Sequence, residues 1–152
     1  MSGHLLSIGH GYSARALATR LLEDGWTVTG TTRSHDKVQK LEADGIAPLI
    51  WPGDNLGAAI RQASHILTSV APEDQGDPVL AAVRADLADA APGLDWVGYL
   101  STTGVYGDHE GGWVDESTPL NPSTRRGMAR VAAEAAWQSL AEESGLPLHI
   151  FR

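Results

Sequence analysis

Short apolar runs alternate with amphipathic stretches along most of this chain. Residues 13–24 place Ala14, Leu17, Ala18 and Leu21 on one face at helical spacing, and a glycine follows where such a helix would end. Similar patterns predict further helices over residues 36–43, 58–63, 78–90 and 124–144. The apolar runs have the length of buried strands, and they predict strands over residues 5–8, 26–31, 48–51, 65–70, 96–101 and 148–151.

Strand and helix alternate from one end of the chain to the other, which is typical of βαβ units around a parallel sheet. The sequence therefore predicts the α/β class, with a doubly wound parallel sheet and helices on both faces, as one domain over residues 1–152. Residues 103–123 break the alternation as a long loop that contains several Gly and Pro residues. A loop of that length in a compact domain is usually functional.

Composition narrows the classes of partner. The chain has 152 residues and a net charge of −8, without a cluster of Lys and Arg, which argues against binding to nucleic acid or to an anionic membrane. It has no cysteine, and no pair of histidines has metal-binding spacing, so no disulfide and no metal site is expected. No apolar run approaches the roughly 20 residues of a membrane span. Because the N-terminus also lacks the basic start of a secretory signal, we expect a cytoplasmic protein.

The first predicted strand runs directly into the segment 9–14, which has the pattern G-x-G-x-x-A. This pattern, between a strand and an amphipathic helix, is typical of dinucleotide-binding sites. The first glycine allows the tight turn, the second lets the backbone approach a pyrophosphate, and the alanine lets the helix pack on the strand. The alternative is a tight turn that binds nothing. The residues predicted to hold the pyrophosphate are Gly9, His10, Gly11, Tyr12 and Ser13.

The end of the second predicted strand indicates which dinucleotide fits. Sites that prefer NAD place an acidic residue about 20 residues after the first glycine, where it binds the ribose 2′-hydroxyl. Here, 22 residues after Gly9, the sequence reads Thr-Thr-Arg-Ser, with no acid. Thr32, Arg33 and Ser34 suit a 2′-phosphate by charge and by hydrogen bonding, so NADP is favoured and NAD is the alternative. If the site does not select NADP, Arg33 is an ordinary exposed arginine.

Together with the glycine-rich turn, the segments 100–108, 113–124 and 132–137 resemble the extended short-chain dehydrogenase/reductase family, in particular its NAD-dependent epimerase/dehydratase branch. The resemblance implies a Rossmann-type NAD(P)-binding domain. It also implies that Val70, Ala71 and Pro72 line the cofactor cleft and that Asp54 lies near the adenine. Since members of this family continue with a substrate-binding lobe, we expect residues 1–152 to lack that lobe.

The chemistry of this family depends on a Ser or Thr that binds the reacting oxygen and on a Tyr-x-x-x-Lys segment, whose tyrosine transfers the proton. By the resemblance, Thr102 takes the first role. Arg126 stands in the tyrosine position and Arg130 in the lysine position, where Arg130 can still anchor ribose or phosphate. Arginine cannot act as an acid or base at ordinary pH. The sequence is most similar to an atypical subgroup of the family that lacks the tyrosine.

Several residues are alternatives for the missing acid or base. Tyr106 supplies a phenol in the Val-Tyr-Gly segment, and His109 and Glu110 lie in the long loop. The expected function is an oxidoreductase or epimerase acting on a small-molecule substrate, a nucleotide sugar or a related carbonyl compound. The alternatives are a non-catalytic nucleotide-binding or redox-sensing module, or the inactive N-terminal portion of an enzyme.

Two further features bear on partners. Trp113, in the long loop, is a candidate for stacking on a substrate ring, although packing is the ordinary role of a tryptophan. The helix predicted over residues 124–144 is rich in alanine, so it can approach its copy closely in a homodimer or pack on its own sheet.

Overall fold

The computed structural model describes residues 2–152 and contains one sheet of six strands in the order β3-β2-β1-β4-β5-β6. Every pair of neighbouring strands is parallel, so the predicted doubly wound α/β fold is confirmed. The strands are β1 (His4–Ile8), β2 (Thr27–Thr32), β3 (Ala47–Ile50), β4 (His65–Thr68), β5 (Trp96–Leu100) and β6 (Leu148–Phe151).

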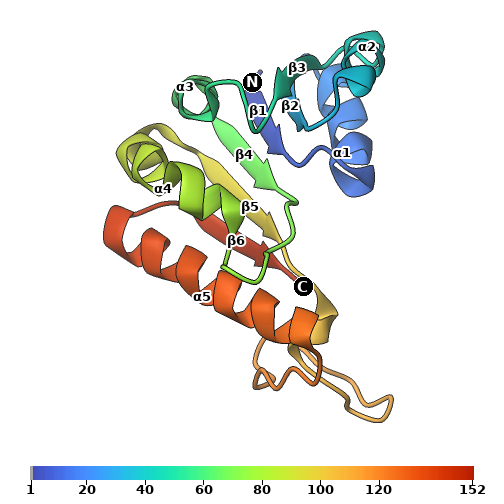
Figure 1. Ribbon diagram of the computed structural model, residues 1–152, viewed down its shortest axis with the longest axis vertical. Coiled ribbons are helices and arrows are strands. Elements are labelled where there is room, and N and C mark those ends of the chain that lie inside the picture. Colours follow the sequence, from blue (N-terminus) through green and yellow to red (C-terminus); the bar gives the residue numbers. More distant parts are fainter. Residues whose placement is uncertain (1) are drawn as a thin grey trace.

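Helices cover both faces of the sheet (Figure 1). On one face lie α1 (Tyr12–Glu23) and α2 (Val38–Ala43). On the other face α3 (Leu56–Gln62) packs on α4 (Pro78–Ala90), and α4 packs on α5 (Arg125–Ser144). Three short 3-10 turns complete the list: η1 (His35–Lys37), η2 (Ala91–Gly93) and η3 (Thr103–Val105).

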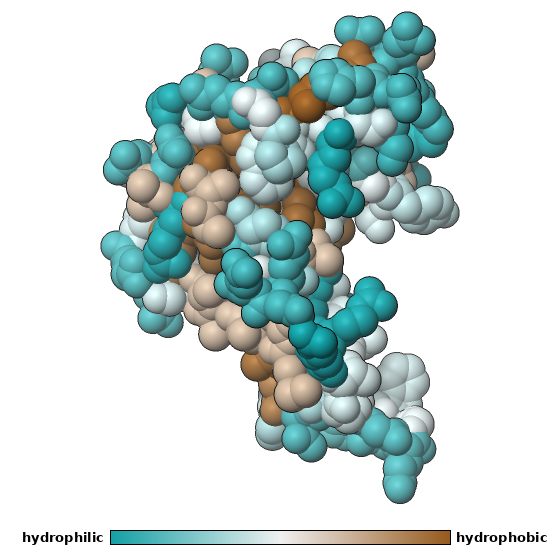
Figure 2. Space-filling model, viewed as in Figure 1, coloured by the Kyte–Doolittle hydropathy of each residue, from teal (hydrophilic) through white to brown (hydrophobic). Residues whose placement is uncertain are grey.

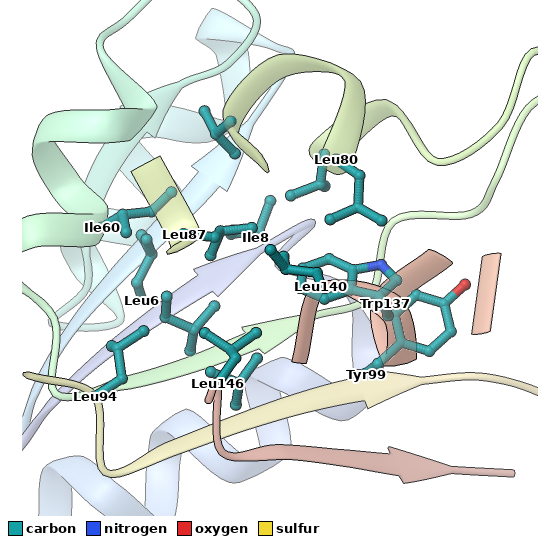
Figure 3. Close-up of a cluster of buried hydrophobic side chains, with 14 of the residues drawn as sticks. Leu6, Ile8, Ile60, Leu80, Leu87, Leu94, Tyr99, Trp137, Leu140 and Leu146 are labelled. Atoms are coloured by element: carbon teal, nitrogen blue, oxygen red, sulfur yellow. The ribbon is translucent and has the colours of Figure 1, made fainter. Parts of the chain in front are cut away.

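The two faces of the sheet form two hydrophobic cores, which explains why the strands read as nearly continuous apolar runs. On β1, Leu6 and Ile8 belong to the larger core under α3, α4 and α5, whereas Leu5 belongs to the smaller core under α1 and α2. This division follows the period of two of a strand. Figure 3 shows Ile8 beside Leu87 of α4 in the larger core, with Leu6 on the side of Ile60.

A buried carboxylate joins α4 to α5. Asp77 caps the start of α4: its Oδ1 accepts hydrogen bonds from the backbone N–H groups of Val79 at 2.9 Å and Leu80 at 3.0 Å. Its Oδ2 accepts a hydrogen bond of 3.0 Å from the indole Nε1 of Trp137. Because both groups are buried, this contact fixes α5 against α4 and thereby sets where the first turn of α5 lies.

The structure moves several predicted boundaries. The helix expected over residues 58–63 begins at Leu56, because the side chain of Asn55 accepts a hydrogen bond from the backbone of Ala58. The helix expected over residues 36–43 is a 3-10 turn followed by α2, and the strand expected to reach residue 70 ends at Thr68. The loop over residues 103–123 contains η3. No helix within residues 2–152 is both long enough and apolar enough to cross a membrane.

Candidate functional site

A hollow opens at the carboxyl ends of β1 and β4, the neighbouring strands whose following helices lie on opposite faces of the sheet. This switch point is the usual ligand position of a doubly wound fold. In the space-filling view the molecule is hollowed between the α1–α2 end and the start of α5, and hydrophilic side chains border the hollow (Figure 2). It consists of two adjoining clefts, which share Ala71, Pro72 and Glu73.

The first of these, named here the glycine cleft, has a volume of about 470 Å³. The remaining residues that line it are Gly9, His10, Gly11, Thr31, Thr32, Arg33, Lys37, Leu41, Trp51, Pro52, Val70 and Pro78. The second, named here the arginine cleft, has a volume of about 640 Å³. Its remaining lining residues are Asp74, Thr102, Gly104, Thr124, Arg125, Arg126, Gly127, Ala129 and Arg130.

The turn after β1 needs its first glycine. Gly9 has a φ of +76°, and a Cβ there would lie 2.8 Å from the Cγ2 of Val70. Its N–H donates a hydrogen bond of 2.7 Å to the hydroxyl of Thr31, which ties the turn to β2. Around Gly11, in contrast, a Cβ would meet only the Gly9 carbonyl oxygen, at 3.8 Å. The backbone of Gly11 is therefore open to a ligand in the glycine cleft.

The start of α1 is suited to a negatively charged group. Gly11 is the N-cap residue, no side chain caps the helix, and the first turn carries no acidic residue. The first backbone N–H groups and the positive end of the helix dipole are thus available to an anion. Tyr12 and Ser13, which were predicted to hold the pyrophosphate, are exposed and do not line the glycine cleft with their side chains. The prediction that these two residues hold the pyrophosphate therefore concerns their backbone N–H groups.

The imidazole of His10 packs against strands β1 and β2. Its Nδ1 is hydrogen-bonded to the hydroxyl of Ser7 at 2.9 Å, and a Cβ on Gly30 would lie 3.1 Å from the Cγ of its ring. Its Nε2 is buried without a hydrogen-bond partner among residues 2–152. Burial, together with the positive charge of Arg15, lowers the pKa of His10, and the carboxylate of Asp44 acts in the opposite direction. His10 is thus held neutral in the wall of the glycine cleft.

Beyond β2 two basic side chains line the glycine cleft, whereas Asp36, the acid that precedes Lys37 in η1, does not line it. The hydroxyl of Thr32 accepts a hydrogen bond of 3.1 Å from the backbone N–H of Ser34, which forms the turn. Arg33 is exposed and lines the glycine cleft, whereas Ser34 does not line it. Lys37, four residues beyond Arg33 in η1, also lines the cleft and was missed by sequence reasoning. The sequence pattern, which predicted a regular helix over residues 36–43, gave no signal for it.

In the arginine cleft, Arg130 is held firmly. Its Nη1 donates to the hydroxyl of Tyr99 at 3.0 Å and to the carbonyl oxygen of Leu100 at 2.8 Å. The centre of its guanidinium group lies 5.6 Å from the centre of the Tyr99 ring. Burial is the main reason that the pKa of Tyr99 is raised, although Arg130 opposes this shift. The charge of Arg130 is therefore fixed at the carboxyl end of β5.

Of the other residues considered for catalysis, one lines a cleft and the rest do not. Thr102 lines the arginine cleft, and its hydroxyl oxygen accepts a hydrogen bond of 3.2 Å from the N–H of Gly104. Tyr106 is 5% exposed and lines neither cleft; its hydroxyl accepts from Nη1 of Arg152 at 3.4 Å. His109 and Glu110 are exposed in the long loop, away from the lining of both clefts.

Two further sequence candidates lie outside the clefts. Trp113 is fully exposed in the long loop and lines neither cleft. Asp54 closes the turn after β3, where its Oδ2 accepts a hydrogen bond of 2.7 Å from the backbone N–H of Ile50. It does not line the glycine cleft either. Among residues 2–152, no group of three or more His, Cys, Asp or Glu side chains is placed to hold a metal ion.

Comparison with known proteins adds relatives at three levels of similarity. No protein-family model matches the sequence. Protein YeeZ of Escherichia coli strain K12 is 30% identical over 131 residues, which span 79% of this chain and 47% of YeeZ. A functionally unknown conserved protein from Silicibacter pomeroyi DSS has a solved structure that is 50% identical with a TM-score of 0.92, over 99% of this chain and 51% of that one.

A more distant structural neighbour is UDP-glucuronic acid 4-epimerase from Bacillus cereus, in complex with UDP-glucuronic acid and NAD. It is 18% identical with a TM-score of 0.77, over 98% of this chain and 55% of that one. At this identity the likeness shows only that the two proteins share a Rossmann-type fold. The chain spans about half the length of each of these relatives.

Proposed function

We propose that this chain binds a nicotinamide dinucleotide in the glycine cleft and prefers NADP to NAD. The observation that carries the proposal is the edge of this cleft beyond β2, where Arg33 and Lys37 line the cleft and no acidic side chain of that edge does. A 2′-phosphate is stabilised by two cations, whereas the 2′-hydroxyl of NAD is normally bound by an acid at this edge. The epimerase from Bacillus cereus, whose fold is similar, has NAD bound.

The cleft fits the rest of a dinucleotide as well. Gly11 lacks a side chain at the place where a pyrophosphate would approach, and the uncapped start of α1 offers backbone N–H groups to it. Val70, Ala71 and Pro72 line the wall at the end of β4, and the last two continue into the arginine cleft. When bound, the nicotinamide ring supplies hydride exchange. An extended dinucleotide would reach from the Arg33 edge towards Thr102 and Arg130.

For chemistry, the arrangement supports an oxidoreductase or epimerase acting on a carbonyl compound of the nucleotide-sugar type. Thr102 can hydrogen-bond the reacting oxygen, and Arg130 can hold the ribose or a phosphate beside it. Tyr106 is the phenol predicted beside Thr102, and because it is buried and lines neither cleft, it can transfer a proton to a bound substrate only if its hydroxyl moves into the arginine cleft.

A second candidate function is a nucleotide-binding module without catalysis. It is favoured by Arg126, which lines the arginine cleft at the position where the resemblance expects a tyrosine. A guanidinium group stays protonated near neutral pH and so cannot act as an acid or base. Binding together with consumption of NADPH in the presence of a panel of carbonyl compounds would support the enzyme, and tight binding without consumption would support the module.

The cofactor preference is tested by measuring the Kd of NADPH and NADH by fluorescence for the wild type and Arg33→Ala. Loss of a charge-assisted contact with a phosphate is worth about 1.5–3 kcal/mol, so NADPH binding should weaken roughly 10- to 100-fold while NADH binding stays within about twofold. Arg20→Ala is the matched control, because Arg20 is exposed on α1 and lines neither cleft. Equal losses for both dinucleotides in Arg33→Ala would refute the preference for NADP.

A further inference from the structure

Two positive charges of the arginine cleft lie close together, and the proposed dinucleotide gives a role to only one of them. Arg126 and Arg130 are separated by one turn of α5, so they lie on the same face of the helix, and both line the cleft. Like charges at this spacing repel each other and destabilise a helix. Neither arginine has a carboxylate partner in the part of the chain that the structure describes. An anion between them would remove this repulsion.

The third arginine of the cleft is already neutralised. Arg125 forms an ion pair with Asp74 through a distance of 2.6 Å between Nη2 and Oδ2. Both side chains are more than three-quarters exposed, so the pair lies at the mouth of the cleft and contributes little to stability. It does, however, keep the carboxylate of Asp74 beside Arg125, so that this acid is engaged away from Arg126 and Arg130.

Hydrogen-bond donors converge with these charges. Arg130 uses Nη1 for Tyr99 and Leu100, and its Nε and Nη2 donate to no residue between 2 and 152. The hydroxyl oxygen of Thr102 accepts from Gly104, and its proton has no acceptor within the same residues. A guanidinium group and a hydroxyl group that keep donors towards a cleft are matched by the oxygens of a carboxylate or a phosphate.

The charge of this cleft also contrasts with that of the chain. The net charge is −8, yet five of the 11 Lys and Arg residues line one of the two clefts, and three of them line the arginine cleft. Two acids, Glu73 and Asp74, line it as well, so its lining is positive by one charge. A neutral sugar or ketone would gain nothing from that charge, whereas an oxyanion would.

We therefore infer that the arginine cleft binds a substrate that carries an oxyanion, a carboxylate or a phosphoryl group, between Arg126 and Arg130 with a hydrogen bond from Thr102. The inference rests on the proposed function only in taking this ligand to be the substrate of the same site. Arg126 then has a function of its own: it binds the charge of the substrate at the position where the resemblance expects a proton-transferring tyrosine. For the carbonyl substrate proposed above, the inference names the two arginines that hold its anionic group.

The test is a titration of the 15N-labelled chain with inorganic phosphate and, separately, with malonate, followed by NMR through assigned backbone amides. Gly104 and Gly127 line the arginine cleft, and Gly9 and Gly11 line the glycine cleft, so the spectrum reports which cleft each probe enters. We expect saturable shifts at Gly104 and Gly127. Arg126→Gln should weaken this binding at least tenfold, and Arg126→Lys, which keeps the charge but loses the planar donors, should weaken it less. Arg20→Gln is the matched control and should bind as the wild type does.

The outcomes separate the two proposals. Tighter binding of phosphate assigns a phosphoryl group, and tighter binding of malonate assigns a carboxylate; either supports the inference. Shifts confined to Gly9 and Gly11, or shifts at Gly104 and Gly127 that persist in Arg126→Gln, would overturn it. NADPH is added in a separate titration that reads Gly9 and Gly11, so the dinucleotide proposal can fail while the oxyanion site stands, or the reverse. The spectrum of each variant also shows directly whether it is folded.

Discussion

Glu134 on α5 is 2% exposed and holds Arg152, at the end of β6, through a distance of 2.7 Å between Oε2 and Nη2. Its other oxygen, Oε1, accepts a hydrogen bond of 2.5 Å from the hydroxyl of Ser101. Arg152 in turn lies over the ring of Tyr106, 5.4 Å from its centre, and these contacts raise the pKa of the Arg152 guanidinium. One buried carboxylate thus joins the ends of β5 and β6 to α5, directly below the turn that carries Thr102.

Removing this carboxylate should destabilise the fold. Glu134→Ala leaves the guanidinium of Arg152 largely buried without its counter-charge, and breaking such a pair costs about 3 kcal/mol or more. The free energy of unfolding, measured in urea, should fall by that amount. Glu142→Ala on the exposed side of the same helix is the control and should change it by less than about 0.5 kcal/mol. If the two variants are equally stable, the buried pair does not hold these elements together.

A close approach between α5 and η3 leads to the second prediction. At Gly127 a Cβ would lie 2.8 Å from the carbonyl oxygen of Gly104 and 2.9 Å from the Cβ of Pro122. Neither group can yield by a side-chain rotation, so Gly127→Ala should move the start of α5 away from η3. Overpacking costs about 1–3 kcal/mol, and the better helix propensity of alanine recovers up to about 1 kcal/mol. We expect a net loss of about 1 kcal/mol in the free energy of unfolding.

The matched control is Gly93→Ala, because a Cβ there meets nothing within 4 Å and the backbone does not require glycine. It should leave the stability unchanged or raise it slightly. Since Arg126 adjoins Gly127, the Gly127→Ala variant should also bind phosphate more weakly in the arginine cleft. Unchanged stability in Gly127→Ala would mean that the contact with η3 can relax without cost.

The fold could be predicted from the sequence because its rules are local. Alternation of strands and helices, each with its own period, requires no knowledge of distant contacts, and even the glycine turn is a local pattern. One error falls where a single polar side chain decides the boundary: Asn55 caps α3 and so moves its start. The turn η3 within the long loop is likewise set by a single hydroxyl, that of Thr102.

The site was harder to predict, because it depends on which side chains meet across the sheet. The motif around Tyr106 predicts a phenol in the cleft. In the structure its hydroxyl is instead hydrogen-bonded to Arg152, which lies 46 residues away in the sequence. Lys37 lines the glycine cleft from η1, a turn that the sequence pattern did not predict. The pairing of Arg125 with Asp74, which leaves Arg126 and Arg130 with the charge of the arginine cleft, is also a contact between distant segments.

The half-buried imidazole of His10 leads to a prediction about pH. The pKa of His10 lies below the ordinary value of 6.5, chiefly because burial disfavours the charged form. In addition, a proton added to its buried Nε2 would have no hydrogen-bond acceptor among residues 2–152. The unfolded chain therefore takes up this proton first as the pH falls. By linkage, the contribution of His10 to stability is complete above about pH 6.5 and is lost as the pH falls from there towards the lowered pKa.

The measurement is the free energy of unfolding in urea at about pH 7.5 and about pH 5.5, a window that brackets the ordinary pKa of histidine and avoids most carboxylates. The wild type should be less stable at the lower pH. His10→Gln, which cannot titrate, should lose less stability between the two, although His4 retains a share because burial lowers its pKa as well. His35→Gln, on the exposed turn before α2, should behave as the wild type does. An equal loss in His10→Gln and the wild type would show that His10 is not the group that makes the fold sensitive to acid.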